Sequence, residues 1–286
     1  MYLQNTGRIF NIAVFLLFSS LIFTGCNKNS TFKTDKNSKA KKAGSHEVVI
    51  YSVERSPQIP FARANITFPG QDELLEDDDV YVVIEVDNFQ LGVQTNTMRA
   101  KELSNSPKGQ HVHLIVDNKP YIAVYEQDHP VNVGKLGPGT HTVVAFPSRS
   151  YHESVKSPTA FDIKNFDIVS PGGSNVVNRD TPSIIYSRPK GTYKGVDAKE
   201  IMLDFYLNDV ELSPDGNFAR YSISKINSAG DSNDVYTIDI HEWEPSFISG
   251  LSSGVYTVTL ELLDSTGNLV PGAWNNTTRE IEVISE

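Results

Sequence analysis

The sequence predicts an all-β protein that contains two tandem β-sandwiches. Apolar residues recur at every second position in residues 80–87 and again in residues 201–208, which is the period of a strand with one buried face. From Val48 onward, the segments between such strands are rich in Gly, Pro, Asn and Asp, and no segment keeps a helical period over ten residues. A length of 286 residues also fits two domains of roughly 100–200 residues each.

The two predicted sandwiches are copies of one unit. Residues 80–91 align with residues 201–212 without a gap, and residues 136–143 align with residues 251–258. The two offsets are 121 and 115 residues, which indicates a diverged tandem repeat. The predicted boundaries are 46–166 for the first unit, 167–180 for a Gly/Ser/Asn-rich linker and 181–286 for the second unit.

The N-terminus has the pattern of a secretory leader. Arg8 is the only charge before an apolar run at residues 9–23, which is shorter than the roughly 20 residues of a membrane-spanning helix. The run ends in Phe23-Thr-Gly-Cys26, and Cys26 is the only cysteine. This ending resembles the lipobox of bacterial lipoproteins. The resemblance implies a signal peptide at residues 1–25, cleavage before Cys26 and acylation of Cys26.

Residues 26–45 are expected to form the lipid anchor and a flexible, Lys-rich tether, because they contain too few apolar residues to fold. By resemblance to lipoprotein sorting rules, Asn27 disfavours retention at an inner membrane, so we expect the periplasmic face of the outer membrane. Residues 1–45 carry seven basic residues and one acid, whereas the rest of the chain has 18 basic and 34 acidic residues. That acidic balance argues against a nucleic-acid partner, which requires a basic face.

A short motif, Leu-x-x-Gly-x-[His/Tyr]-Thr-Val, occurs in both units. It resembles the tyrosine corner of immunoglobulin-like sandwiches, in which a Tyr near the start of strand F bonds to upstream backbone. Tyr256 has this place in the second unit and His141 in the first. The resemblance implies two tandem immunoglobulin-like domains behind the signal peptide and tether, and it makes His141 a structural residue.

The two units differ in two loops. The first unit has a long loop at residues 92–109 and a polar loop at residues 147–156, where the second unit has short turns. In an immunoglobulin-like topology these are the B–C and F–G loops, which lie at the same end of the sandwich. We therefore expect a binding surface there, on which arginines hold an anionic group and the tyrosine supplies contact area. Its candidate residues are Arg99, Lys101, Lys108, His111, Arg149, Tyr151 and His152.

A metal site is the alternative interpretation of the same region. His111 and His113 lie two residues apart in one predicted strand and therefore share a face. Imidazole and thioether groups are suitable ligands for a copper ion, so His152 and Met98 could complete the site. Against this interpretation, His113 could point into the core of the sandwich and be hydrogen-bonded there.

The sequence contains no Gly-x-Ser-x-Gly elbow, His-Glu-x-x-His motif, Walker loop or dinucleotide-binding glycine motif, so we expect no enzyme activity. The acidic run at residues 77–79 is interpreted as a solvated turn. Residues 110–121 and 145–154 resemble a family of bacterial envelope lipoproteins often labelled phosphopeptide-binding. The His-x-His-Leu pattern at residues 111–114, followed by Leu-x-x-Gly-x-His-Thr at residues 136–142, is similar to small periplasmic domains that handle copper. These resemblances imply a non-catalytic binding protein for a peptide, a glycan or an envelope protein, or else a copper-binding lipoprotein.

Overall fold

The computed structural model describes residues 47–226 and 232–285. In these residues the chain forms seventeen strands and two helical turns, α1 (Arg99–Glu102) and the 3-10 turn η1 (Gly195–Ala198). No described helix is long and apolar enough to cross a membrane. The predicted signal peptide, Cys26 and the tether lie outside the described residues.

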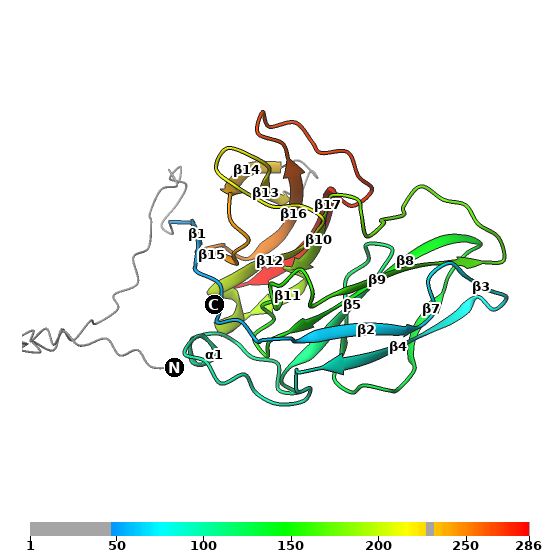
Figure 1. The fold of residues 1–286 in the computed structure, drawn as a ribbon. Coiled ribbons are helices and arrows are strands. Elements are labelled where there is room, and N and C mark those ends of the chain that lie inside the picture. The colour runs from blue at the N-terminus through cyan, green and yellow to red at the C-terminus, as the bar shows by residue number, and fades with distance from the viewer. Residues whose placement is uncertain (1–46, 227–231, 286) are drawn as a thin grey trace, which may run out of the picture. The chain divides into compact units, whose positions relative to one another are not determined.

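The first sandwich consists of a three-stranded and a five-stranded sheet (Figure 1). Its interior contains Val80, Val82 and Ile84, the alternate residues of one strand, which are almost completely buried. In spatial order, one sheet contains β2 (Arg63–Phe68), β4 (Asp79–Asp87) and β7 (Val131–Lys135), and the other contains β3 (Glu73–Leu75), β9 (Asp162–Ile168), β8 (Gly139–Ser148), β5 (His111–Val116) and β6 (Ile122–Val124).

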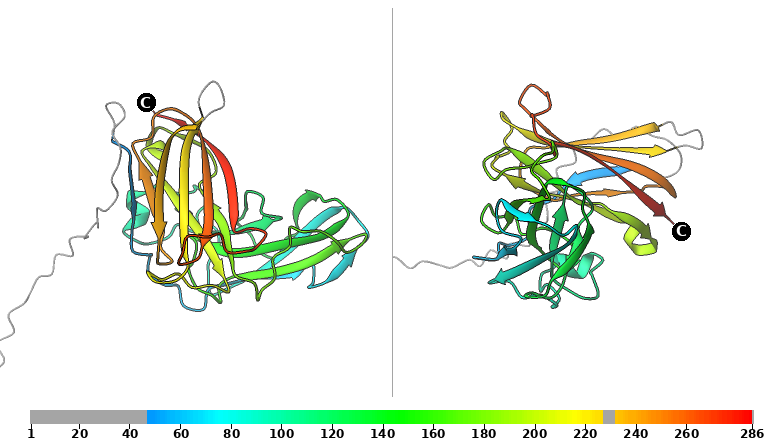
Figure 2. Two further views of the ribbon diagram at one scale, coloured as in Figure 1. Left: turned by 90° about the horizontal axis from the view of Figure 1, so that it is seen from above. Right: turned by 90° about the vertical axis from the view of Figure 1, so that its right-hand side faces the viewer.

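The second sandwich has the same plan around its own core, which includes Leu203, Phe205 and Leu260. Its long strands lie side by side in the left view of Figure 2. In spatial order, one sheet contains β1 (Val49–Ser52), β15 (Ser246–Ser249), β12 (Glu200–Asn208) and β10 (Ser183–Arg188), and the other contains β11 (Gly191–Lys194), β17 (Asn276–Ile284), β16 (Gly254–Leu263), β13 (Phe218–Ile226) and β14 (Ser232–Ile240).

The strand orders of the two sandwiches correspond strand for strand. The order β2-β4-β7 matches β10-β12-β15, and β3-β9-β8-β5-β6 matches β11-β17-β16-β13-β14. In each five-stranded sheet, the strand that comes first along the chain pairs in parallel with the strand that comes last along the chain. These pairs are β3 with β9 and β11 with β17, and the other pairings are antiparallel. The protein is an all-β chain of immunoglobulin-like sandwiches.

The strand β1 differs from the prediction. Residues 49–52 were expected in the first unit, but β1 pairs with β15 at the edge of a sheet of the second sandwich. Ile50 is buried in the core of that sandwich. Since β15 is otherwise an edge strand with unpaired backbone groups, an antiparallel partner satisfies its hydrogen bonds. The predicted boundary at residue 46 is therefore wrong for this strand.

The repeated corner motif forms equivalent contacts in both sandwiches. Tyr256 Oη donates a hydrogen bond to the carbonyl oxygen of Ser252 (2.8 Å), and His141 Nε2 makes the matching bond to the carbonyl oxygen of Gly137 (2.7 Å). His141 Nδ1 bonds the Asp117 carboxylate (2.6 Å). Because both ring nitrogens have structural partners, His141 is a structural residue, as predicted.

The outer face of β5 is covered by the second sandwich. Val112 and Leu114 point into the first core, whereas Ile115 belongs to a separate buried cluster that joins the two sandwiches. We call it the interface cluster; its members are Ile115, Tyr121, Val144, Phe146, Phe161, Ile163, Val177, Ile185, Tyr206 and Trp274. All six residues of β5 are therefore buried, including His111 and His113 on the Ile115 side. Without a metal, His113 was expected to point into the core of the sandwich. It is buried instead at the interface between the two sandwiches.

Candidate metal centre

The two unusual loops of the first sandwich lie against each other. The amide of Ser106 donates to the carbonyl oxygen of Ser150 (2.7 Å), and the amide of Thr95 donates to the Ser150 hydroxyl (3.1 Å). The first loop connects β4 to β5 and the second connects β8 to β9, so both lie at one end of the sandwich. The predicted juxtaposition of residues 92–109 and 147–156 is present in the structure.

Arg99 and Arg149, expected to hold an anionic ligand, instead surround a buried carboxylate. Arg99 Nη1 lies 2.6 Å from Glu153 Oε2, and the amide of Ser56 donates to Glu153 Oε1 (2.8 Å). Arg149 is 2% exposed and donates to the carbonyl oxygens of Ser154 and Pro57. Burial alone would raise the pKa of Glu153, but Arg149, Lys156 and Arg99 hold this pKa below its ordinary value. The predicted role of both arginines as ligand-binding residues is therefore wrong, because their positive charges face the buried carboxylate of Glu153.

Tyr151 was expected to supply exposed contact area, but it is 2% exposed. Its ring packs with Met202 and Phe247 of the second sandwich, and its hydroxyl contacts Ser56 Oγ (2.8 Å) and Thr97 Oγ1 (3.2 Å). The apolar ring is thus buried between the two sandwiches. Tyr151 is therefore a packing residue, which corrects its predicted role.

Three of the predicted residues remain at the surface. Lys101 is exposed on α1, and Lys108 is exposed with its ammonium group 5.3 Å from the centre of the Tyr125 ring. Met98 is 67% exposed at the start of α1, so it does not share the buried position of the histidines.

His111, His113 and His152 converge on one point, and we call them the histidine cluster. One ring nitrogen of each lies within 4.8 Å of the other two. His111 Nε2 lies 3.0 Å from His113 Nε2 and 3.2 Å from His152 Nδ1. His152 contacts His111 of β5 from a tight turn. Its own φ in that turn is 70°, a left-handed conformation that non-glycine residues seldom adopt.

The second nitrogens of the two strand histidines have partners outside the cluster. His111 Nδ1 donates to the carbonyl oxygen of Gly109 (2.9 Å), since a carbonyl can only accept. His113 Nδ1 lies 3.0 Å from the hydroxyl of Ser187, in β10 of the second sandwich. The hydroxyl of Tyr121 lies 3.3 Å from His152 Nδ1, and its ring stacks on His113 with centroids 3.5 Å apart. These contacts fix the ring orientations.

The histidine cluster favours neutral imidazoles. Burial lowers the pKa of His111 to about 4, and it lowers the pKa of His113 well below the usual range. Burial and the charge of Arg188 also lower the pKa of His152. At neutral pH all three rings are therefore uncharged, and each can offer a lone pair.

The spacing fits a small coordination sphere. Ligands at about 2.0–2.1 Å from a tetrahedral ion lie about 3.3 Å from each other. The distances from His111 Nε2 to His113 Nε2 and to His152 Nδ1, 3.0 and 3.2 Å, are close to that value, and the third pair of nitrogens lies within 4.8 Å. Among the described residues, the group contains no carboxylate. Its donors are the imidazoles that zinc and copper ions prefer.

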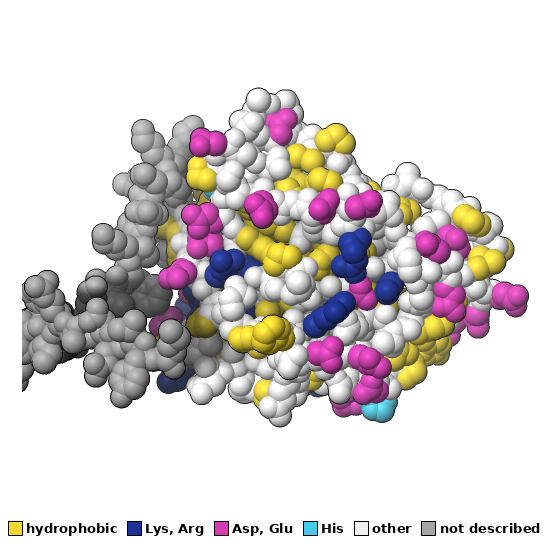
Figure 3. All heavy atoms as spheres, in the orientation of Figure 1, with side chains coloured by type: hydrophobic (Ala, Val, Ile, Leu, Met, Phe, Trp, Pro, Cys, Tyr) yellow, Lys and Arg dark blue, Asp and Glu magenta, His cyan; other side chains and the backbone are white. Residues whose placement is uncertain are grey.

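Ser187, Arg188 and Lys190 were not predicted. They belong to the second sandwich, which was expected to act as scaffold or spacer, yet they lie beside the histidine cluster. Figure 3 shows several Lys and Arg side chains near the middle of the visible face of the molecule. No local pattern in the sequence links these residues to His113, because the contact depends on how the two sandwiches pack.

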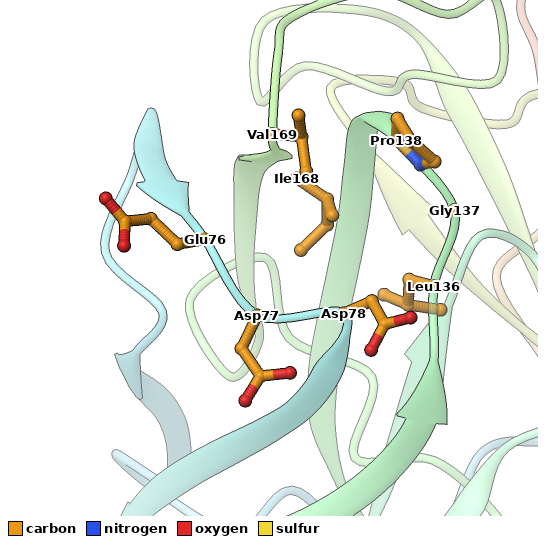
Figure 4. Close-up of a pocket in the computed structure, with 8 residues that line it drawn as sticks. All are labelled: Glu76, Asp77, Asp78, Leu136, Gly137, Pro138, Ile168 and Val169. Atoms are coloured by element: carbon orange, nitrogen blue, oxygen red, sulfur yellow. The ribbon is translucent and has the colours of Figure 1, made fainter.

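A cavity of about 550 Å³ lies at the opposite end of the first sandwich (Figure 4). Asp77 accepts a hydrogen bond from the amide of Asp79 (2.9 Å), and Asp78 pairs with Lys135 (3.0 Å). These local contacts agree with the interpretation of the acidic run as a solvated turn. The cavity is lined by Glu76, Asp77, Asp78, Leu136, Gly137, Pro138, Ile168 and Val169.

No protein-family model matches the chain, and no curated protein matches it. Several solved structures match the chain at low identity and with TM-scores below 0.5. The fibronectin(III)-like modules of Clostridium thermocellum CbhA are 12% identical, with a TM-score of 0.25 over 78% of this chain and 94% of that one. Latent PorU from Porphyromonas gingivalis is 11% identical, with a TM-score of 0.27 over 80% of this chain and 20% of that one. The FN1–FN3 domains of chicken CNTN1 are 10% identical, with a TM-score of 0.23 over 80% of this chain and 66% of that one.

Proposed function

We propose that this chain is a non-catalytic, lipid-anchored envelope protein that binds one transition-metal ion through His111, His113 and His152. The observation that carries the proposal is that His111 Nε2 faces ring nitrogens of both other histidines, at 3.0 and 3.2 Å. His111 Nδ1 carries the ring proton because it donates to a carbonyl, so Nε2 has one lone pair. One lone pair is poorly matched to two neighbouring nitrogens, whereas a metal ion accepts a lone pair from all three.

The contacts around the cluster also support metal binding. A metal-bound histidine usually donates its other ring N–H to a carbonyl or another acceptor, which fixes its orientation. His111 has the Gly109 carbonyl in this place, and His113 has the Ser187 hydroxyl. Without a metal, the same atoms can form a chain of hydrogen bonds in which His113 Nε2 donates to His111 Nε2. Measured metal content separates these two states.

The donor set favours copper or zinc. Calcium and magnesium prefer several oxygen ligands, and the described group contains only histidines. Imidazole is a suitable ligand for copper and zinc. Of these two ions we propose copper, which is the ion expected in the metal interpretation of the sequence.

The envelope location rests on the sequence alone. The lipobox-like ending at Cys26 and the short apolar run before it support a lipid anchor. The predicted recognition of a peptide or glycan has less support, because Arg99, Arg149 and Tyr151 make internal contacts.

Metal titration tests the proposal. We expect one Cu(I) ion per chain in the purified protein, measured by competition with a coloured Cu(I) chelator under reducing conditions. His111→Gln, His113→Gln and His152→Gln should each lower the affinity by at least about tenfold, as is usual for altering a metal site. His129→Gln is the matched control, since this histidine is exposed. No bound copper in the wild type, or equal binding by all four variants, would contradict the proposal.

A further inference from the structure

Two cationic side chains of the second sandwich lie beside the histidine cluster. Lys190 Nζ is 3.7 Å from the centre of the Tyr121 ring and donates to the Tyr121 carbonyl oxygen (2.7 Å). The same ring stacks on His113, with centroids 3.5 Å apart and planes 9° apart. Since a ring face holds only one close neighbour, Lys190 and His113 lie on opposite faces of Tyr121. A single aromatic ring therefore separates the ammonium group from the imidazole.

Arg188 approaches the cluster along the end of β10. It follows Ser187, whose hydroxyl contacts His113 Nδ1 at 3.0 Å. Its guanidinium carbon lies 6.0 Å from the centre of the Tyr121 ring, and its Nε is buried without a hydrogen-bond partner. Among the residues that the structure describes, neither Arg188 nor Lys190 forms an ion pair with a carboxylate. Their charges are therefore not neutralised by direct contact.

This positive field acts on the histidines. The Arg188 guanidinium carbon and Lys190 Nζ lie 6.0 and 3.7 Å from the centre of the Tyr121 ring, and that ring stacks directly on His113. The field therefore opposes any positive charge placed among the three rings. A doubly charged ion would experience twice the repulsion of a singly charged ion at the same position. The described ligand group itself contains no carboxylate, and the carboxylates that act on Arg188, those of Asp204 and Asp197, lie outside it.

We infer that Arg188 and Lys190 determine the charge selectivity of the centre, so that it favours Cu(I) over divalent ions with similar ligand preferences, such as Zn(II). The inference rests on the proposed function, because it concerns the same three ligands. It assigns a role to the second sandwich. Arg188 at the end of β10 and Lys190, two residues later, supply the positive charges, while the first sandwich supplies the three metal ligands.

The test compares Cu(I) and Zn(II) affinities in the full-length protein, each measured by competition with a coloured chelator of that ion. Arg188→Gln and Lys190→Gln should each raise the ratio of Zn(II) to Cu(I) affinity by about tenfold, from the Coulomb energy of one added unit charge at an intermediate dielectric. Arg188→Lys and Lys190→Arg keep the charge and should leave the ratio close to that of the wild type. Lys135→Gln removes an exposed charge on β7, at the cavity end of the first sandwich, and should not change it.

The outcomes separate the two proposals. If the wild type does not bind Cu(I) at one equivalent per chain, the proposed function fails. If it binds Cu(I) but the neutral variants change both affinities by the same factor, only the charge-selectivity inference fails. Circular dichroism identifies a variant that does not fold, and Lys190, being less buried than Arg188, then carries the test.

Discussion

Ser187 Oγ and His113 Nδ1 lie 3.0 Å apart, although the two residues belong to different sandwiches and are separated by 74 positions in the chain. Both side chains are almost completely buried. The hydrogen bond fixes the orientation of His113, so the geometry of the candidate centre depends on the packing of the second sandwich against β5.

The first prediction concerns this bond. Ser187→Ala removes the outer partner of His113 and should lower Cu(I) affinity by about 10–100-fold, the usual effect of losing such a contact. Ser183→Ala is the control, because Ser183 is a buried serine of the same strand whose hydroxyl bonds the carbonyl oxygen of Thr181. Affinity is measured by chelator competition. Equal affinities in the two variants would show that Ser187 does not orient the site.

Gly109 gives a second prediction for the same site. It has a φ of +83°, a Cβ there would lie 2.4 Å from the carbonyl oxygen of Val93, and its own carbonyl accepts the His111 bond. Gly109→Ala should therefore lower both stability and Cu(I) affinity. Gly92→Ala has a similar φ with open space, so it should cost only about 1–2 kcal/mol of backbone strain and keep the affinity. Urea denaturation and Cu(I) titration of both variants provide the check.

The pH dependence of stability should reflect the three histidines. Their pKa values in the metal-free folded protein are lowered by burial, to about 4 for His111, whereas unfolded histidines titrate near about 6.5. As the pH falls below about 6.5, the unfolded state binds more protons, so the free energy of unfolding decreases. Each histidine contributes a slope of about 1.4 kcal/mol per pH unit.

Urea denaturation of the metal-free protein between pH 7.5 and 5 measures this slope. His113→Gln should reduce it by the contribution of one histidine, because Gln binds no proton in either state. His129→Gln changes an exposed histidine and should leave it unaltered. A wild-type slope near zero in this range would be inconsistent with buried neutral rings.

Glu153 provides a prediction for the loop end. Glu153→Gln removes the carboxylate that Arg99, Arg149 and Ser56 contact, and it leaves a buried guanidinium without a counter-charge. We expect a loss of about 3–5 kcal/mol in the free energy of unfolding, as for breaking a buried ion pair. Glu126→Gln is the control, because that side chain is 80% exposed. Similar stabilities in chemical denaturation would mean that the ion cluster contributes little.

Processing at Cys26 is a prediction from the sequence. The native protein should lack residues 1–25 and carry acyl chains on an N-terminal Cys26, and mass spectrometry of membrane fractions detects both. Cys26→Ser should release the protein from the membrane. Membrane-bound material with an intact Met1 would refute the lipoprotein assignment.

Much of the fold could be predicted from the sequence because it depends on local patterns. The two-residue period of residues 80–87 and 201–208 gave strands β4 and β12, and the repeated Leu-x-x-Gly motif gave equivalent corners at His141 and Tyr256. Two residues that share a strand face are also fixed locally, which is why His111 and His113 were found. The topology then brought the 92–109 and 147–156 loops to one end, where His152 joins them.

The packing of the two sandwiches decided the rest. A charge pattern does not show which partner a side chain meets, so Arg99 and Arg149 resembled ligand-binding residues but neutralise Glu153. The position of β1 in the second sandwich depends on an unpaired sheet edge far along the chain. Ser187, Arg188 and Lys190 reach the histidines only because the interface cluster buries the outer face of β5. Backbone periodicity is encoded locally, whereas burial, ion pairing and the surroundings of the histidine cluster depend on contacts between residues distant in sequence.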